Sequence, residues 1–204
     1  MANLNTTVSI LALSLLAGTA TLDLNVKDKG QSTQEVSIVE NTNGTMIDDF
    51  SQEIYSWWKN SDEKFALERE DEMLKVTVKS AGADKTNPWD CFGRQFDEMD
   101  LTKTPVIKMK VKSDKPGKMR VYLKDANGMV TNAIGVDKQL PVGDFKEVYF
   151  DLTGKWSQSW PDKQTVDPAE IGEMLIFING GGPEFKGTIY IDDVEAVAVS
   201  EMPK

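Results

Sequence analysis

The tryptophans of this chain lie in polar stretches that are typical of loops and strand ends. The five of them fall in three places: Trp57 with Trp58, Trp89 alone, and Trp156 with Trp160. Gln158 lies between the last two and supplies a side-chain amide beside them. An exposed aromatic plane next to amide or carboxylate groups suits a ligand with apolar C–H faces and polar edges, as sugar rings have. These residues are therefore candidate binding residues for a carbohydrate.

Each candidate also has a purely structural explanation. Consecutive strand residues face opposite ways, so at most one of Trp57 and Trp58 faces the core if the segment is extended, and the other should be exposed. A single tryptophan is more often a packing residue than a ligand platform. Further candidates are Tyr122 and Asn132, which lie in or just after central strands, and Arg94, which follows a glycine. For these three the alternative is a solvated strand residue that binds nothing.

The composition excludes several kinds of chemistry. The chain has 204 residues and no histidine, which removes the usual general base, the commonest transition-metal ligand and every Ser-His or Cys-His nucleophile. Cys91 is the single cysteine, so no intramolecular disulfide and no thiolate zinc site can form. The net charge of -10 argues against nucleic acid as a partner, because phosphate binding needs a basic surface.

The N-terminal segment predicts export. Residues 8–18 form an apolar run followed by small residues, which indicates a secretory signal over residues 1–20 rather than a membrane span. The run at 15–18 has the form of a bacterial lipobox, but Thr19 stands where the acylated cysteine would be. The alternative is a hydrophobic strand or helix that packs into the fold.

Residues 21–35 are polar and aperiodic, as expected of a linker between an export signal and a domain. We therefore expect a protein that is secreted or associated with the cell envelope, in the periplasm or on the outer surface of a bacterium. Any membrane attachment would come only through the N-terminal segment.

From residue 36 onward the chain reads as a series of short strands. Six segments have the composition of strands: 74–79, 106–112, 119–124, 146–152, 174–179 and 187–194. The first three alternate apolar and polar residues, which gives each strand one face for the core. Turn-forming residues at 113–117 and 125–128 predict hairpins, and residues 167–172 predict one helical turn. The pattern indicates an all-β, antiparallel β-sandwich or jelly roll over residues 36–204, with about eight to ten strands.

The order of five motifs resembles a known architecture. They lie at Met46–Phe50, Asp100–Lys103, Leu123–Gly128, Val142–Leu152 and Gly187–Val194. In this order they resemble the galactose-binding-like jelly rolls, specifically carbohydrate-binding modules of families 4, 9, 11 and 22, over residues 46–197. Proteins that bind no glycan share the architecture, so the resemblance implies the fold more strongly than the ligand.

The same resemblance implies a structural Ca²⁺. In such modules, acidic residues of the opening and closing strands commonly help to hold the ion, and the corresponding positions here are Asp48 or Asp49 and Asp192. Calcium takes six to eight oxygen ligands and accepts carboxylates from different strands. Ser51 stands where the family usually has Glu. The alternative is that these acids lie at solvated strand ends and bind no ion.

We therefore expect an exported, non-catalytic protein that binds a polysaccharide or oligosaccharide. One alternative is a cell-surface structural or assembly protein that uses the sandwich for protein contacts. A second is a carboxylate-dependent glycosidase or lyase. Aromatic rings gathered on one concave face with amides beside them would favour binding, whereas two carboxylates facing each other across a groove would favour the enzyme.

Overall fold

The computed structural model describes residues 44–82, 90–132, 136–157 and 164–204. Within these ranges the chain forms eleven β-strands and one short 3-10 helix, Val199–Glu201. The strands are β1 (Thr45–Asp48), β2 (Trp57–Lys59), β3 (Phe65–Glu70), β4 (Met73–Ala81), β5 (Cys91–Met99), β6 (Val106–Ser113), β7 (Lys118–Asp125), β8 (Lys138–Gln139), β9 (Lys146–Asp151), β10 (Ile171–Ile178) and β11 (Phe185–Val197). In the same ranges, no helix has the length and hydropathy needed to cross a membrane.

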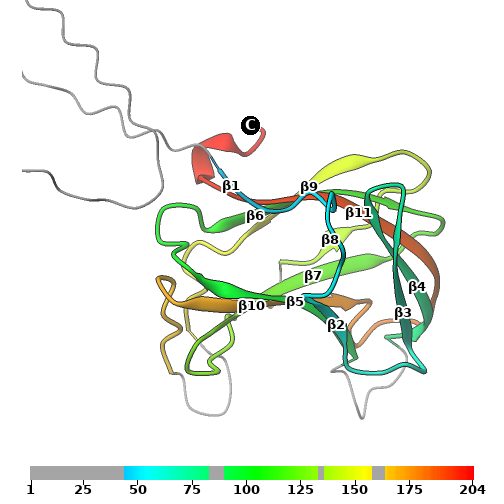
Figure 1. Ribbon diagram of the computed structural model, residues 1–204, viewed down its shortest axis with the longest axis horizontal. Helices are drawn as coiled ribbons and strands as arrows, with labels where there is room; N and C mark the ends of the chain where they lie inside the picture. The colour runs from blue at the N-terminus through cyan, green and yellow to red at the C-terminus, as the bar shows by residue number, and fades with distance from the viewer. Residues whose placement is uncertain (1–43, 83–89, 133–135, 158–163) are drawn as a thin grey trace, which may run out of the picture. The chain divides into compact units, whose positions relative to one another are not determined.

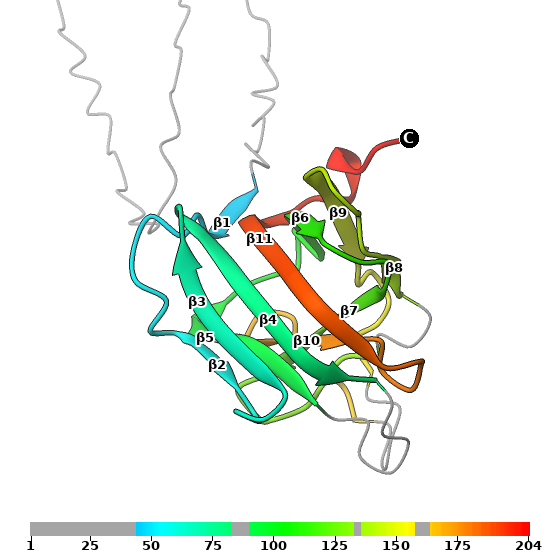
Figure 2. The same ribbon diagram turned by 90° about the vertical axis from the view of Figure 1, so that its right-hand side faces the viewer.

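The strands form two antiparallel sheets that face each other as the layers of a sandwich (Figure 1). One sheet has the order β3-β4-β11-β6-β9, and β1 also pairs with β11. The other has the order β2-β5-β10-β7-β8. Figure 2 shows β3, β4 and β11 side by side in the six-stranded sheet. The predicted all-β sandwich is therefore confirmed.

The core fills the space between the two sheets. On β4, the side chains of Leu74, Val76 and Val78 are buried, and the residues between them are not. The same period-two burial recurs on β6 and β7, because alternate strand residues face opposite sides of a sheet. The outward-facing side chains of these strands do not fill the core, so they can contribute to a binding surface.

The connections differ in part from the sequence prediction. Residues 113–117 do not join a hairpin, because β6 belongs to the six-stranded sheet and β7 to the other, so the chain crosses between sheets there. Turn residues indicate that a strand ends but not which sheet receives the next one. Residues 125–128 do form a tight turn, closed by an antiparallel bridge between Lys124 and Val130. Residues 167–172 contain a turn and the start of β10, with no helix.

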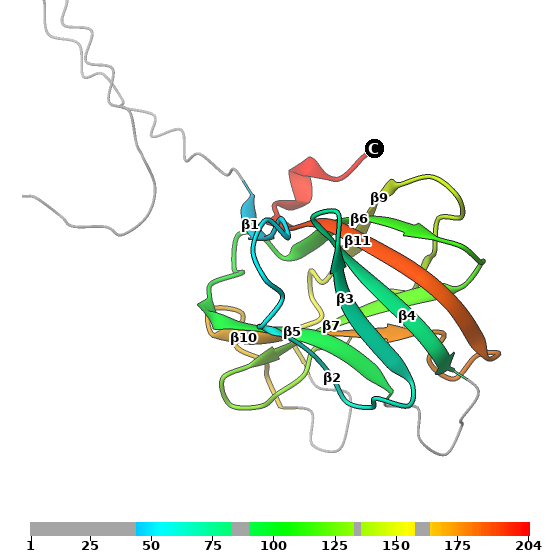
Figure 3. The ribbon, with the colours of Figure 1, turned by 45° about the vertical axis from the view of Figure 1, so that its right-hand side comes forward.

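The predicted signal segment (1–20) and linker (21–35) lie outside the described residues. Export and the boundary at residue 36 therefore stay predictions. The described fold begins with β1 and ends beyond β11, and these two strands pair with each other (Figure 3).

Candidate functional site

The outer face of the five-stranded sheet carries a row of side chains that crosses four strands. Trp58 on β2 lies opposite Gly93 on β5, Gly93 lies opposite Leu175 on β10, and Leu175 lies opposite Tyr122 on β7. The next residue on β10, Ile176, is fully buried in the core. Because strand residues alternate between faces, the row points away from the core.

Gly93 makes room for the indole ring of Trp58. A side chain at this position would begin 3.1 Å from Trp58 Cζ2 and would clash with the backbone carbonyl of Met174. The ring of Trp58 therefore lies against the glycine backbone, next to Leu175 in the adjacent strand. Trp58, Leu175 and Tyr122 thus lie in one row at half-buried positions on the same face of the sheet.

Tyr122 is held in one orientation by its neighbours. Its ring meets that of Phe177 edge-on, with 5.1 Å between the centroids. Arg120 Nη1 donates to the Tyr122 hydroxyl at 3.1 Å, and the same guanidinium makes two bonds of 2.9 and 2.7 Å to the carboxylate of Asp137. Burial opposes the charge on Arg120, but the bonds to Asp137 and Tyr122 raise its pKa. The tyrosine ring is thus preorganised, which lowers the entropy cost of binding a ligand.

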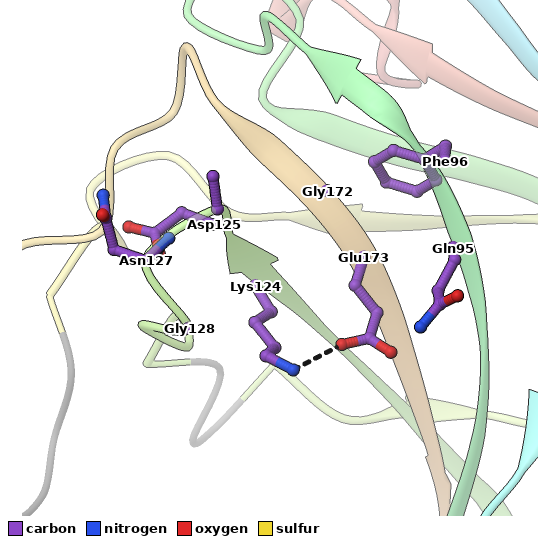
Figure 4. Close-up of a pocket in the computed structure, with 9 residues that line it drawn as sticks. Gln95, Phe96, Lys124, Asp125, Asn127, Gly128, Gly172 and Glu173 are labelled. Atoms are coloured by element: carbon purple, nitrogen blue, oxygen red, sulfur yellow. Dashed lines mark hydrogen bonds and ion pairs between the residues drawn. The ribbon is translucent and has the colours of Figure 1, made fainter.

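A polar row runs beside the apolar one. Gln95 lies opposite Glu173 and Glu173 opposite Lys124, and Lys124 Nζ donates to Glu173 Oε2 at 2.8 Å (Figure 4). Glu173 is only 8% exposed. Together with Phe96 and the 125–128 turn, these residues line an open depression of about 470 Å³. This volume lies within the range of about 300–1,000 Å³ that is usual for ligand sites.

The two rows together supply the chemistry of ring recognition. The apolar row can take the C–H face of a ring, and the polar row can bond to its hydroxyl groups. On this face the carboxylates of Glu173 and Asp137 are each ion-paired with a cation, Lys124 and Arg120 respectively. The arrangement is suited to binding and orienting a ligand.

The structure places Trp57 and Arg94 on the core side of the same sheet. Trp57 is 7% exposed and belongs to the core. Its Nε1 donates to Asp48 Oδ2 at 2.9 Å, Arg94 Nε donates to the same oxygen at 2.7 Å, and Phe50 N donates to Oδ1 at 2.9 Å. Since β1 lies in one sheet and β2 and β5 in the other, this Asp48 cluster ties the two sheets together.

Two further sequence candidates lie among the described residues, Asn132 and Trp156, and neither belongs to the two rows of the outer face. Asn132 donates its backbone N–H to the Lys155 carbonyl at 2.9 Å, and Trp156 is half-buried against the core. Loop position alone suggested an uncovered Trp156, but tertiary packing covers one side of it. Three further candidates lie outside the described residues: Trp89, Gln158 and Trp160. Trp58 and Tyr122 are the two sequence candidates in the apolar row of the outer face, and Trp58 is half-buried rather than exposed.

The predicted calcium ligands are only partly suited to an ion. Both carboxylate oxygens of Asp48 already accept hydrogen bonds. Across the described ranges, no group of three or more His, Cys, Asp or Glu side chains is placed to hold a metal. Burial, then the charges of Asp193 and more weakly Asp49, raise the pKa of Asp192. A cation between Asp49 and Asp192 would relieve that repulsion, but backbone carbonyls would have to supply the other ligands.

The calcium prediction has a direct thermal test. If Asp49 and Asp192 hold the ion, added Ca²⁺ raises Tm by several degrees over the value in EDTA, because a ligand that binds only the folded state stabilises it. Asp192→Asn is expected to remove this rise. An identical Tm with Ca²⁺ and with EDTA would eliminate the ion from the fold.

Cys91 is a buried residue of β5 that we expect to be unreactive. Burial, followed by the charges of Glu173 and Asp90, raises the pKa of its thiol to about 12. The reactive thiolate is therefore almost absent in the folded protein at pH 8. Thiol-specific alkylation followed by mass spectrometry should show labelling only after denaturation. Rapid labelling of the folded protein would contradict this expectation.

The fold of this chain is similar to that of several solved structures. No protein-family model and no curated protein sequence matches the chain. The family 11 carbohydrate-binding module of the cellulosomal cellulase Lic26A-Cel5E of Clostridium thermocellum matches with a TM-score of 0.53 at 15% identity, over 78% of this chain and 96% of the module. The Clostridium thermocellum family 11 module in complex with a β-1,3-1,4-mixed-linked tetrasaccharide matches with a TM-score of 0.51 at 15% identity, over 76% of this chain and 95% of that one.

An enzyme is also among the structural neighbours. The agarase AgWH50C matches with a TM-score of 0.55 at 11% identity, over 76% of this chain but only 24% of the agarase. The shared part is thus about a quarter of that enzyme. These likenesses establish the carbohydrate-binding-module-like jelly roll as the fold of this chain, as the order of motifs predicted.

Proposed function

We propose that this protein binds a carbohydrate on the outer face of its five-stranded sheet. The observation that carries the proposal is the pairing of an apolar row, which contains Trp58 and Tyr122, with a polar row, which contains Gln95, Glu173 and Lys124. Sugar rings have apolar C–H faces beside polar edges, and the two rows match this division.

The fold comparison supports the ligand class. A family 11 module with the same fold is known in complex with a β-1,3-1,4-mixed-linked tetrasaccharide. At this level of identity the fold alone does not carry a function from one protein to another. The argument for a carbohydrate therefore rests on the residues of the outer face, and the comparison adds to it.

We further propose that binding occurs without catalysis and outside the cytoplasm. Retaining and inverting glycosidases need two carboxyl groups flanking the scissile bond, one of them protonated. On the outer face Lys124 pairs with Glu173 and Arg120 pairs with Asp137, so neither carboxylate is presented unpaired to a ligand. The export proposal rests on the apolar run at 8–18 in the sequence.

The function is tested by affinity gel electrophoresis against a panel of polysaccharides: mixed-linked β-glucan, agarose, xylan and galactomannan. Wild-type protein should be retarded by at least one gel, and Tyr122→Ala should bind about 10- to 100-fold more weakly because it removes a central aromatic contact. Trp58→Ala is also expected to weaken binding to the polysaccharide.

Tyr149→Ala is the matched control, because Tyr149 lies on β9 in the other sheet. It should bind as wild type does. Equal loss in Tyr149→Ala and Tyr122→Ala, or no retardation of the wild type in any gel, would refute binding at this face. Release of new reducing ends from a retained polysaccharide would refute the non-catalytic part of the proposal and leave the binding part standing.

A further inference from the structure

A second depression lies beside the first, across the turn at the end of β7. It has a volume of about 480 Å³ and is lined by Asp125, Asn127, Met129 and residues 164–168. Asp125 and Asn127 also line the first depression. The 125–128 turn is therefore the ridge between two neighbouring hollows, and Figure 4 shows Asn127 at the end of the first hollow far from Gln95.

The groups around the second depression suit a hydroxyl-rich ligand. Asn127, Gln164 and Thr165 are exposed and present amide and hydroxyl groups. Met129 and Pro168 are half-buried and supply apolar surface beside them. A mixture of hydrogen-bonding groups and apolar surface is also what the first depression offers, so one kind of ligand fits both.

Both walls of the second depression are fixed in place by backbone hydrogen bonds. On one side Asp125 holds its own turn, since its Oδ1 accepts from the N–H groups of Asn127 at 3.0 Å and Met129 at 2.8 Å. Its Oδ2 accepts from the N–H of Asp167 at 3.0 Å, which draws the opposite wall towards the turn. Val166 N donates to the Trp156 carbonyl at 3.0 Å and anchors that wall to the core. The hollow is thus formed before any ligand arrives.

We infer that the two depressions are consecutive subsites for a single glycan chain that passes over Asn127. The inference rests on the proposed function and deepens it by naming the ligand as an oligosaccharide or polysaccharide long enough to occupy both hollows. A monosaccharide or disaccharide fills the first depression alone. The glycan would leave the sheet past the end of β7, beyond the row that contains Trp58 and Tyr122.

The test uses isothermal titration with a size ladder made by partial hydrolysis of each polysaccharide that retards the wild type. For the wild type, affinity should rise with fragment length beyond the shortest fragment that binds. The double variant Gln164→Ala/Thr165→Ala changes two exposed residues that line the second depression and not the first. It should bind short fragments as the wild type does and lose about tenfold in affinity for long ones, which is about 1.4 kcal/mol. The control variant Gln139→Ala removes an exposed amide on β8 of the same sheet, outside both depressions. It should change neither the affinity for short fragments nor the affinity for long ones.

The outcomes separate this inference from the proposed function. If the double variant weakens short and long fragments equally, or if wild-type affinity does not depend on length, the second subsite does not exist while binding at the outer face stands. If Tyr122→Ala leaves binding unchanged and the double variant abolishes it for all lengths, the glycan lies elsewhere and both proposals fail. Melting curves of all variants exclude unfolding as the cause of any loss.

Discussion

Replacing Asp48 by alanine is expected to lower the free energy of unfolding by about 3 kcal/mol, because it leaves the partly buried Arg94 guanidinium and the Trp57 indole N–H without their acceptor. The side chains of Asp48 and Arg94 are 15% and 18% exposed, and their Oδ2–Nε distance is 2.7 Å. Trp57 Nε1 donates to the same oxygen. Urea denaturation followed by tryptophan fluorescence measures the change as a lower midpoint with an unaltered slope.

A double-mutant cycle assigns this loss to the pair. Arg94→Met removes the charge while keeping an apolar stem, and the variant Asp48→Ala/Arg94→Met should be more stable than the sum of the single changes predicts. Asp97→Ala, at an exposed position of β5, serves as the control and should shift stability by no more than about 0.5 kcal/mol. Additive single effects would show that Asp48 and Arg94 do not stabilise the fold through each other.

The strands were predictable where burial alternates regularly. On β4, β6 and β7 the sequence period of two is the burial period, and the predicted ranges match the observed strands within two residues at each end. β5 was missed because Cys91, Phe92 and Gly93 are all buried at its start, so its sequence does not alternate. Phe92 faces the core, whereas Cys91 and Gly93 face the outer side of the sheet, where neighbouring groups cover them.

The pairing of strands was the part that the sequence did not contain. Turn residues at 113–117 predicted a hairpin, whereas the chain crosses to the other sheet. Such crossings are set by which apolar faces must cover each other, and that is a property of the whole chain rather than of the turn. The number of strands also exceeded the expectation, since β2 and β8 have only three and two residues and leave almost no periodic signal.

The candidate site was predictable in chemistry but only partly in location. The alternation argument separated Trp57 from Trp58, and the structure puts the first in the core and the second on the outer face. The polar row was missed, because a Gln, Glu or Lys at an outward strand position has the same sequence pattern whether it faces water or a ligand. Only the register of β5, β10 and β7 shows that Gln95, Glu173 and Lys124 are neighbours.

The position of Arg94 also follows from strand geometry, which the sequence pattern does not reveal. It follows Gly93, and Gly93 faces the outer surface, so Arg94 points to the core side, where it meets Asp48. A residue predicted to bind ligand and a residue predicted to bind metal are thus partners of each other. The ion pair links β1 of one sheet to β5 of the other, and this link holds the outer face against the rest of the sandwich.

Replacing Asp125 by alanine is expected to lower the free energy of unfolding by about 2–4 kcal/mol. The residue is only 4% exposed, and its carboxylate accepts three backbone hydrogen bonds, from Asn127, Met129 and Asp167. Alanine leaves these three N–H groups without the carboxylate that accepts from them. Asp125→Asn keeps the oxygen that accepts from Asn127 and Met129 but places an NH₂ donor towards the N–H of Asp167. The free energy of unfolding should therefore fall about half as much as in Asp125→Ala. Thermal and urea denaturation measure both changes.

Asn127→Ala in the same turn provides the comparison that isolates the carboxylate. Asn127 is exposed, and its own backbone N–H is one of the three that Asp125 accepts, so the substitution keeps that bond and should change stability by less than about 0.5 kcal/mol. Equal losses for Asp125→Ala and Asn127→Ala would mean that the turn is stabilised by its sequence as a whole and not by the Asp125 carboxylate. A large loss for Asp125→Ala alone identifies this carboxylate as the group that shapes the ridge between the two depressions, because it holds both the turn and the wall at Asp167.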